Sequence, residues 1–267
     1  MTTEAFILRV FRWVRGLERA VSKRVIGALF RLLMRLRGLV MTLPEGILPR
    51  QLQWNLRRWE LQQPLADYND VMQEALLDSL RSVNPEARGL ASQLLKTQLP
   101  ESPYRSDQQI LSGTFVLAKA LRVLFNRVTA SGESLFMRQQ KDAIERVVQA
   151  GFLAESSNEE LAAKVVATTR RQGVELPLRK VGTLFNKLRA RTESVIAAAL
   201  WDAVNKELKL SFELGGTDEY EWHAVLDPRT CPICWELDGQ RSSSPSGFAY
   251  QPPVHPNCRC LVLPVRD

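Results

Sequence analysis

The 267-residue sequence has no uninterrupted apolar run long enough to cross a membrane. A spanning helix needs about 18 or more apolar residues with few charges, and arginines interrupt every candidate window. A secretory signal would require an uncharged apolar run followed by a small-residue cleavage site, and neither is evident. We therefore expect a chain made in a reducing cytosol, where its four cysteines begin as thiols.

Histidine is scarce, since His223 and His255 are the only two in the chain. The nucleophile motif G-x-S-x-G, the zinc-protease motif H-E-x-x-H and a phosphate-binding glycine loop are all absent from the sequence. Acid–base chemistry would fall to His223 or to a carboxylate, because His255 lies among candidate metal ligands. These absences favour a protein that is not an enzyme.

Positive charge is concentrated at the N-terminus. The formal net charge is +7, and residues 1–43 carry all of that excess. Their acids are Glu4 and Glu18, and their basic residues are Arg9, Arg12, Arg15, Arg19, Lys23, Arg24, Arg31, Arg35 and Arg37. A segment with this balance is expected to bind a polyanion or another partner, and we take these nine residues as candidate contacts.

The same segment shows helical periodicity. Its apolar residues recur at steps of three and four, namely Ile7, Val10, Val14, Leu17, Val21, Val25, Leu29, Leu32 and Leu36. Three interpretations stay open. The arginines neutralise DNA phosphates, the helix lies on a membrane surface, or the apolar stripe is an interface with another protein or another copy of the chain. The preference for arginine over lysine does not separate the first interpretation from the third.

Three further stretches are predicted to be helical, namely residues 51–98, 107–150 and 178–208. The expected core residues of the first stretch are Trp54, Leu56, Trp59, Leu61, Val71, Leu76, Leu77 and Leu80. Ser157 and Glu160 have the spacing of a capping box, so a helix is expected to begin there.

The composition changes after Gly215-Gly216, where the sequence becomes rich in proline and serine. This composition argues against helix and favours two short strands, around Glu221–Val225 and Cys260–Val265. The fold class is therefore mainly α, with a multi-helical body and a small, zinc-stapled C-terminal α+β module of short strands. We divide the chain into three parts: a basic amphipathic helical segment (residues 1–45), a helical region (residues 46–148) and a C-terminal domain (residues 149–267). The cysteine-rich module occupies residues 220–265 of the C-terminal domain.

The four cysteines and one histidine cluster near the C-terminus, as Cys231-Pro232-Ile233-Cys234 and His255-Pro256-Asn257-Cys258-Arg259-Cys260. Structural zinc is bound by four Cys or His ligands, and the sequence offers five candidates. We expect Cys231, Cys234 and Cys258 as ligands, with the fourth place taken by His255 or by Cys260, of which Cys260 is preferred. The role of Zn²⁺ would be structural, because a short proline-rich segment buries little core.

Other interpretations of the cysteines stay open. They are buried thiols without metal, or they form a disulfide. A redox C-x-x-C site is disfavoured, because that motif belongs at a helix N-terminus beside a βαβ unit and the sequence shows neither. Arg259, between two candidate ligands, either binds Asp227 or Asp238 and holds the two cysteine loops together, or is solvated.

Three ordered motifs resemble a known family. They are the run Trp222-His223-Ala224-Val225-Leu226-Asp227-Pro228-Arg229-Thr230-Cys231-Pro232-Ile233-Cys234 with Leu237-Asp238-Gly239, the run Pro252-Pro253-Val254-His255-Pro256-Asn257-Cys258-Arg259-Cys260, and upstream Ala190-Arg191-Thr192-Glu193. Together they resemble the phage Mu F-like head morphogenesis family of minor head (minor capsid) proteins. The resemblance covers roughly residues 150–265 and does not extend to the first 145.

The resemblance implies a structural protein of a tailed phage, made in the host cytoplasm and located in the virion. It would associate with the portal vertex or head interior and act in capsid assembly or DNA packaging and delivery, without enzymatic activity. Expected partners are the portal protein, the major capsid protein or both, and packaged DNA through residues 1–43. A homo-oligomer and membrane contact during delivery stay open.

The alternative is a nucleic-acid-binding zinc module. Residues 221–267 carry a formal charge of −1, so no basic patch surrounds the cysteines in sequence. Some relatives in the family carry fused toxin or ADP-ribosyltransferase domains, and we expect none after Asp267.

Overall fold

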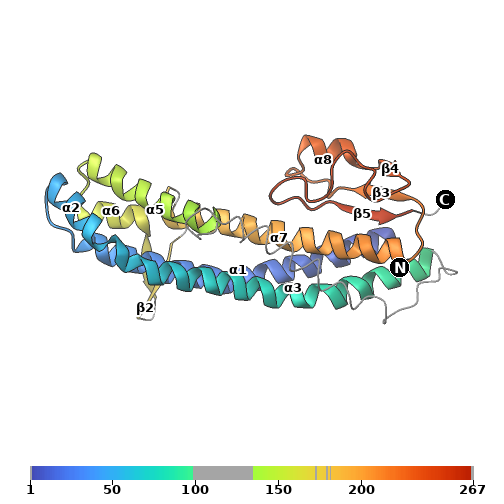
Figure 1. Cartoon of the computed structure of the whole chain (residues 1–267), viewed down its shortest axis with the longest axis horizontal. Helices are drawn as coiled ribbons and strands as arrows, with labels where there is room; N and C mark the ends of the chain where they lie inside the picture. The colour runs from blue at the N-terminus through green and yellow to red at the C-terminus, as the bar shows by residue number, and fades with distance from the viewer. Residues whose placement is uncertain (1, 99–134, 172, 179, 181, 266–267) are drawn as a thin grey trace. The chain divides into compact units, whose positions relative to one another are not determined.

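The computed structural model describes residues 2–98, 135–171, 173–178, 180 and 182–265. Its helices are α1 (Thr3–Met41), α2 (Ile47–Arg57), the 3₁₀ helix η1 (Arg58–Leu61), α3 (Gln62–Gln98), α5 (Leu135–Leu153), α6 (Asn158–Val165), α7 (Leu184–Leu214) and α8 (Pro232–Leu237). Its strands are β1 (Thr168–Arg171), β2 (Val174–Pro177), β3 (Tyr220–His223), β4 (Arg241–Ser242) and β5 (Leu261–Pro264). The predicted fold class, a multi-helical body with a small C-terminal module of short strands, is confirmed (Figure 1).

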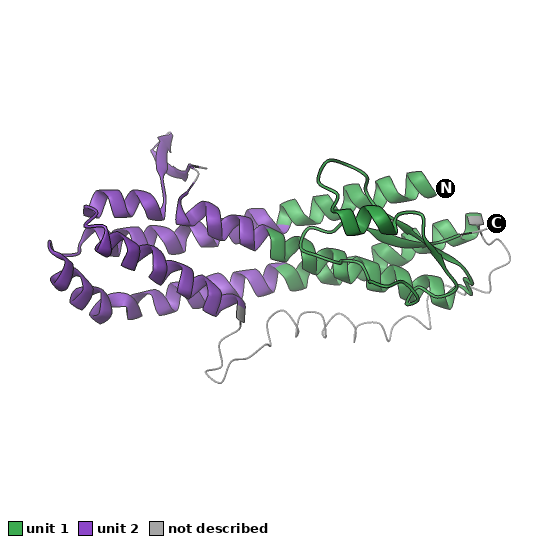
Figure 2. Cartoon of the chain, turned by 90° about the horizontal axis from the view of Figure 1, so that it is seen from above, with its two compact units in different colours: residues 1–20, 76–123, 194–267 green, residues 21–75, 124–193 purple. Residues whose placement is uncertain are grey.

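The described residues fall into two compact units (Figure 2). Residues 2–20, 76–98 and 194–265 belong to the first unit, and residues 21–75 and 135–193 belong to the second. No helix among them combines the length and apolar character that crossing a membrane requires. The boundaries proposed from the sequence at residues 45 and 148 stay a prediction.

Helix α1 buries the predicted apolar stripe. Its fully buried members, each at most 2% exposed, are Val10, Val14, Val21, Val25, Leu29, Leu32 and Leu36. The stripe therefore forms core within each unit and is not a free face, which corrects the interpretation of it as an interface with another protein. The outward face of α1 carries most of the arginines. The helix ends where Thr42 Oγ1 donates to the Leu39 carbonyl at 3.0 Å, two residues before Pro44.

In the first unit, the start of α1 packs with the C-terminal parts of α3 and α7. The rings of Phe6 and Phe212 lie 6.3 Å apart. Arg88 of α3 forms an ion pair of 2.5 Å with Glu207 of α7, whose side chain is 3% exposed. These pairs join residues far apart in sequence, so they fix the helical platform on which the C-terminal module is built.

In the second unit, α6 begins with the predicted capping box: Ser157 accepts from the Glu160 amide, and Glu160 accepts from the Ser157 amide. The hydroxyls of Tyr68 and Thr192 share a buried hydrogen bond of 2.7 Å. Strands β1 and β2 form an antiparallel hairpin that the sequence did not predict. Its side chains are mostly exposed, so no alternation of apolar and polar residues marks it.

The C-terminal module is a three-stranded antiparallel sheet in the order β4-β3-β5, with α8 between β3 and β4 in sequence. Strands β3 and β5 lie close to their predicted positions, and they pair from Tyr220 opposite Pro264 to His223 opposite Leu261. The module has a small core, in which the ring of Trp222, 0% exposed, lies 5.7 Å from that of Phe248.

Several sequence predictions need correction. Leu56 and Trp59, assigned to the core, are 60% and 65% exposed, and Leu77 is 39% exposed. Apolar spacing alone does not distinguish an inward row from an outward one. The long C-terminal helix occupies Leu184–Leu214 rather than 178–208. Most of the predicted helical stretch 107–150 lies outside the described residues, which resume at α5.

Candidate metal centre

The first cysteine pair is positioned by α8. The sequence predicted no helix in this part of the chain, so α8 corrects that prediction. Cys231 is its N-cap, Pro232 occupies the first turn, and the Cys234 amide donates to Cys231 Sγ at 3.3 Å. Six residues are too few for helical periodicity to be read, which is why α8 was missed. The C-x-x-C motif therefore does lie at a helix N-terminus, but the surrounding described strands are antiparallel and form no βαβ unit.

The second cluster lies on the loop that leads into β5. The Cys258 amide donates to the His255 carbonyl at 3.0 Å, which closes a turn around Asn257, where φ is +63°. His255 Nδ1 donates to the Pro256 carbonyl at 2.8 Å, because a carbonyl can only accept. In the neutral ring this leaves the lone pair on Nε2, which lies 3.3 Å from Cys234 Sγ. That tautomer is the one in which a histidine binds a metal through Nε2.

The five candidate ligands form two overlapping groups. Ligand atoms of Cys231, Cys234 and His255 lie within 4.8 Å of one another, and so do those of Cys234, Cys258 and Cys260. Cys234 belongs to both groups. Its sulfur lies 3.8 Å from that of Cys258, and ligand sulfurs in a tetrahedral zinc site are separated by about 3.8 Å. The sequence prediction that these residues come together is matched by the structure, and all four cysteines are free thiols.

The open space among these side chains, about 10 Å³, is at the lower limit of what admits a single water molecule. The centre therefore has room for an ion and no room for a substrate. Its donors are thiols and an imidazole, the ligand types that zinc prefers. The residues present fit a structural metal ion.

The thiols influence one another strongly. The hydrogen bond with Cys260 lowers the pKa of Cys258 to about 5. Burial raises the pKa of Cys234 to about 12, and the contact with Cys258 raises that of Cys260. Cys258 therefore ionises more readily than an ordinary thiol, whereas Cys234 and Cys260 hold their protons more firmly. Further ionisation requires a cation that offsets the repulsion between sulfurs.

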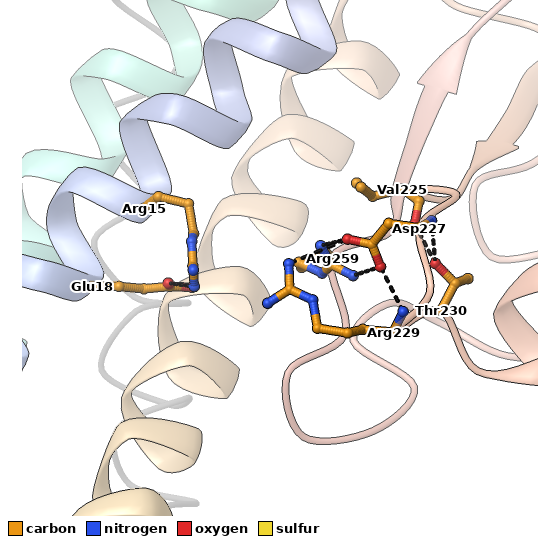
Figure 3. Close-up of polar contacts among 7 residues, drawn as sticks. All are labelled: Arg15, Glu18, Val225, Asp227, Arg229, Thr230 and Arg259. Atoms are coloured by element: carbon orange, nitrogen blue, oxygen red, sulfur yellow. Dashed lines mark hydrogen bonds and ion pairs between the residues drawn. The ribbon is translucent and has the colours of Figure 1, made fainter. Parts of the chain in front are cut away.

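Arg259 connects the two cysteine loops, as one of the two sequence interpretations predicts. Its Nη1 and Nη2 donate to the Asp227 carboxylate at 2.6 and 2.8 Å (Figure 3). Asp227 also accepts from the Arg229 amide at 2.9 Å, and Thr230 Oγ1 donates to the Val225 carbonyl. The bonds from Arg259 hold the pKa of Asp227 well below its ordinary value. A bidentate pair of this kind fixes orientation as well as distance.

Within the first unit, residues of α7 anchor the module. Asn205 Nδ2 donates to the Cys260 carbonyl at 3.1 Å in a buried position. Asn257 Nδ2 donates to Ser194 Oγ at 3.0 Å, and Lys209 donates to Ser246 at 2.5 Å. Sequence reasoning missed these contacts. The one available signal was Asn205 itself, a polar residue on the apolar face of α7.

The nine N-terminal basic residues lie along α1. Arg15 and Arg37 are half-buried, and those exposed are Arg9, Arg12, Arg19, Lys23, Arg24, Arg31 and Arg35. Arg15 pairs with Glu18, Arg24 with Glu74 and Arg37 with Glu175, whereas Arg9 donates to Gln93. Among the described residues no ion pair is formed by Arg12, Arg19, Lys23, Arg31 or Arg35. Their charges are therefore available to a partner.

The Ala190-Arg191-Thr192-Glu193 motif lies on α7. Thr192 is fully buried, Arg191 donates to Gln139, and Arg189 pairs with Glu193 at 2.7 Å. The motif therefore serves helix packing and an ion pair along one helix.

Residues 139–263 match the family model described as phage Mu protein F like protein. The match includes all five candidate ligands and the Ala190–Glu193 motif, and it confirms the resemblance inferred from the motifs. It excludes the N-terminal basic residues. Neither the curated proteins nor the solved structures contained a match to the chain.

Proposed function

We propose that the chain is a structural minor head protein of a tailed bacteriophage, on the premise that residues 139–263 form a domain similar to phage Mu protein F. That family match carries the proposal. The protein would reside in the virion, at the portal vertex or in the head interior, and act in capsid assembly or in DNA packaging and delivery. The small space among the thiols supports a structural role over a catalytic one.

An exposed apolar row on α2 supports assembly with another head component. Leu48, Leu52 and Leu56 recur at steps of four and are each at least 60% exposed, and Trp59 of η1 is 65% exposed. Among the described residues nothing covers this row. Exposed apolar groups in such numbers are typical of surfaces that pack against another protein. We propose the portal protein or the major capsid protein as the partner.

Quantitative mass spectrometry of purified, gradient-separated particles tests the proposal. The protein is expected in every mature particle at a small fraction of the abundance of the major capsid protein. Localisation in intact particles should place it at one vertex or inside the shell. Complete absence from purified particles would overturn the proposal, whatever the state of the metal centre.

We further propose that Zn²⁺ is bound by Cys231, Cys234, Cys258 and one of His255 or Cys260. The overlap of the two ligand groups at Cys234 supports this set. When bound, the ion would supply a cross-link between α8 and the loop before β5, which offsets the ordering entropy of a segment with little core.

Metal analysis of purified variants under reducing conditions separates the ligands. We expect about one equivalent of zinc in the unaltered protein and a large loss in Cys234→Ser. Of His255→Asn and Cys260→Ser, the variant that keeps its zinc identifies the residue that is not a ligand. Less than about half an equivalent in the unaltered protein would contradict the proposal.

For the N-terminal basic residues we propose contacts with packaged DNA. Five of them, namely Arg12, Arg19, Lys23, Arg31 and Arg35, are exposed without an ion pair, which supports this role. Deleting residues 1–43 would remove core, so the test uses substitutions of outward charges. Changing Arg12, Arg19 and Lys23 to Gln should weaken duplex binding. It should also reduce the slope of log affinity against log salt concentration by the contribution of about three phosphate contacts. Unchanged salt dependence would contradict the contact.

A further inference from the structure

The first unit contains a second polar cleft, beside the thiol cluster. Its volume is about 390 Å³, within the range of small-ligand sites. Arg15 and Glu18 of α1, Trp201 of α7, and Arg229, Asn257 and Arg259 of the C-terminal module contribute to its walls. All of these residues belong to one compact unit. The cleft is therefore assembled from segments nearly 250 residues apart in sequence.

Positive charge dominates this cleft. Figure 3 shows the side chain of Arg15 on α1 and those of Arg229 and Arg259 on the module at the space between helix and loops. Arg15 pairs with Glu18 at 2.6 Å, while Asp227 is shared by Arg229 at 3.2 Å and Arg259 at 2.6 Å. Three guanidinium groups thus face two carboxylates, and one positive charge is left without a counter-charge.

The guanidinium groups also keep unused donors. Each carries five N–H groups. Arg259 uses two of them on Asp227, while Arg229 and Arg15 use one side-chain donor each. The remaining donors give the cleft the capacity to bind an acceptor with several oxygens.

Two of the arginines are held in place before any ligand arrives. The guanidinium carbons of Arg15 and Arg259 each lie 6.0 Å from the centroid of the Phe11 ring. The Phe11 ring lies 6.3 Å from that of Trp201, whose Nε1 donates to Glu18 at 3.0 Å. Cation–π contacts and the bidentate pair restrict the side chains, so little rotamer freedom is lost when a ligand binds.

We infer that this cleft binds a phosphate group. A phosphate presents oxygens in several directions and accepts from more than one guanidinium at once, which suits a cleft lined by Arg15 of α1 and by Arg229 and Arg259 of the module. A metal ion is disfavoured by the excess positive charge, and an apolar ligand would leave the guanidinium groups desolvated. The phosphate belongs either to free inorganic phosphate or to a nucleic-acid backbone, which share this chemistry. The inference does not depend on the proposed role in the phage head.

The test uses the full chain in a phosphate-free buffer of low ionic strength. Inorganic phosphate is titrated by calorimetry, and a short DNA duplex by fluorescence anisotropy. The cleft variants are Arg229→Gln and Arg15→Gln. The matched control is Arg81→Gln, which removes the same charge from an arginine of the same unit that is 74% exposed and paired with Asp78 outside the cleft.

Each cleft variant should weaken phosphate binding about tenfold, as expected for loss of a charge-assisted hydrogen bond, and the control should leave it unchanged. If the phosphate comes from nucleic acid, duplex binding should weaken more in the cleft variants than in the control, with free phosphate competing poorly. Equal effects of cleft and control substitutions on both probes would overturn the inference. So would the absence of binding by both probes at millimolar concentration. Arg229 is an exposed side chain, so Arg229→Gln decides the matter if Arg15→Gln impairs folding.

Discussion

The ion pair between Arg88 and Glu207 offers the sharpest test of how the first unit is packed. Arg88 Nε lies 2.5 Å from a carboxylate oxygen of Glu207, whose side chain is only 3% exposed. Burial raises the pKa of Glu207, and the bond with Arg88 opposes that rise. Arg88 therefore stabilises the ionised form of Glu207 against the effect of burial.

Arg88→Met removes the counter-charge and keeps an apolar stem of similar length. Removing one partner of a buried ion pair costs about 3–5 kcal/mol, and the 19% exposure of Arg88 favours the lower end of that range. The cost depends on pH. Because the folded-state pKa is raised, the proton on Glu207 stabilises the fold fully below the unfolded pKa of about 4.3, and this stability is lost as pH rises through the folded pKa. In Arg88→Met the folded-state pKa of Glu207 rises further. The free energy of unfolding of this variant should therefore keep falling to a higher pH than that of the unaltered protein, by up to about 1.4 kcal/mol per pH unit.

Urea denaturation followed by tryptophan fluorescence at pH 5.5 and pH 8 measures both effects. Arg88→Met should be less stable than the unaltered protein at both values and should lose more at pH 8. Glu207→Gln cannot titrate, so the stability of this variant should not carry the pH dependence that Glu207 gives to Arg88→Met. The double variant Arg88→Met with Glu207→Leu should recover most of the stability. A cost below about 1 kcal/mol at pH 8, or an equal cost for Arg88→Met at both values, would refute this account of the pair.

Three further predictions concern the module and the second unit. Removing the metal with a chelator under reducing conditions should increase hydrogen exchange in residues 220–265 but not in the middle of α7; unchanged exchange in the module would argue against a structural metal. The pKa of Asp227 is lowered by its arginine partner, so its contribution is present above its ordinary pKa and is lost as pH falls below it. Fluorescence between pH 5 and pH 2 should therefore show a smaller acid-induced change in Asp227→Asn, and an identical change would refute the pairing. In Gly151→Ala the new Cβ would lie 2.5 Å from a leucine methyl of α6, which should cost about 1–3 kcal/mol in thermal unfolding, whereas Gly16→Ala, with nothing within 4 Å, should cost nothing.

The long helices could be predicted because their buried faces repeat every three or four residues. Seven of the nine residues in the predicted stripe of α1 are fully buried, and the other two, Ile7 and Leu17, are half-buried. The same rule failed at Leu56 and Trp59, since an apolar row at helical spacing that faces outward has the same period as one that faces the core. The hairpin of β1 and β2 carries no pattern, because nearly all of its residues face solvent.

The ligands of the candidate metal centre could be predicted because the chemistry is local: each cluster spans six residues or fewer. Arg259 was recognised for the same reason, from its place between two cysteines. The residues that anchor the module could not be found this way. Asn205 reaches the Cys260 carbonyl across 55 positions of sequence, and Phe11 lies against Arg259 from the other end of the chain. Such contacts depend on the packing of α1 and α7, which spacing does not encode.

One loop serves both the metal centre and the phosphate cleft, so the two sites should be coupled. Cys258 and Cys260 flank Arg259, whose guanidinium lines the cleft. A metal bound by these thiols would hold the loop in the conformation that positions Arg259. Chelation should therefore weaken phosphate binding to the full chain, and phosphate should raise the metal affinity by the same factor, because coupling between two binding sites is reciprocal. Calorimetry of the metal-loaded and metal-free protein measures this factor. Equal phosphate affinities in the two forms would show that Asp227 and Phe11 position Arg259 without help from the metal.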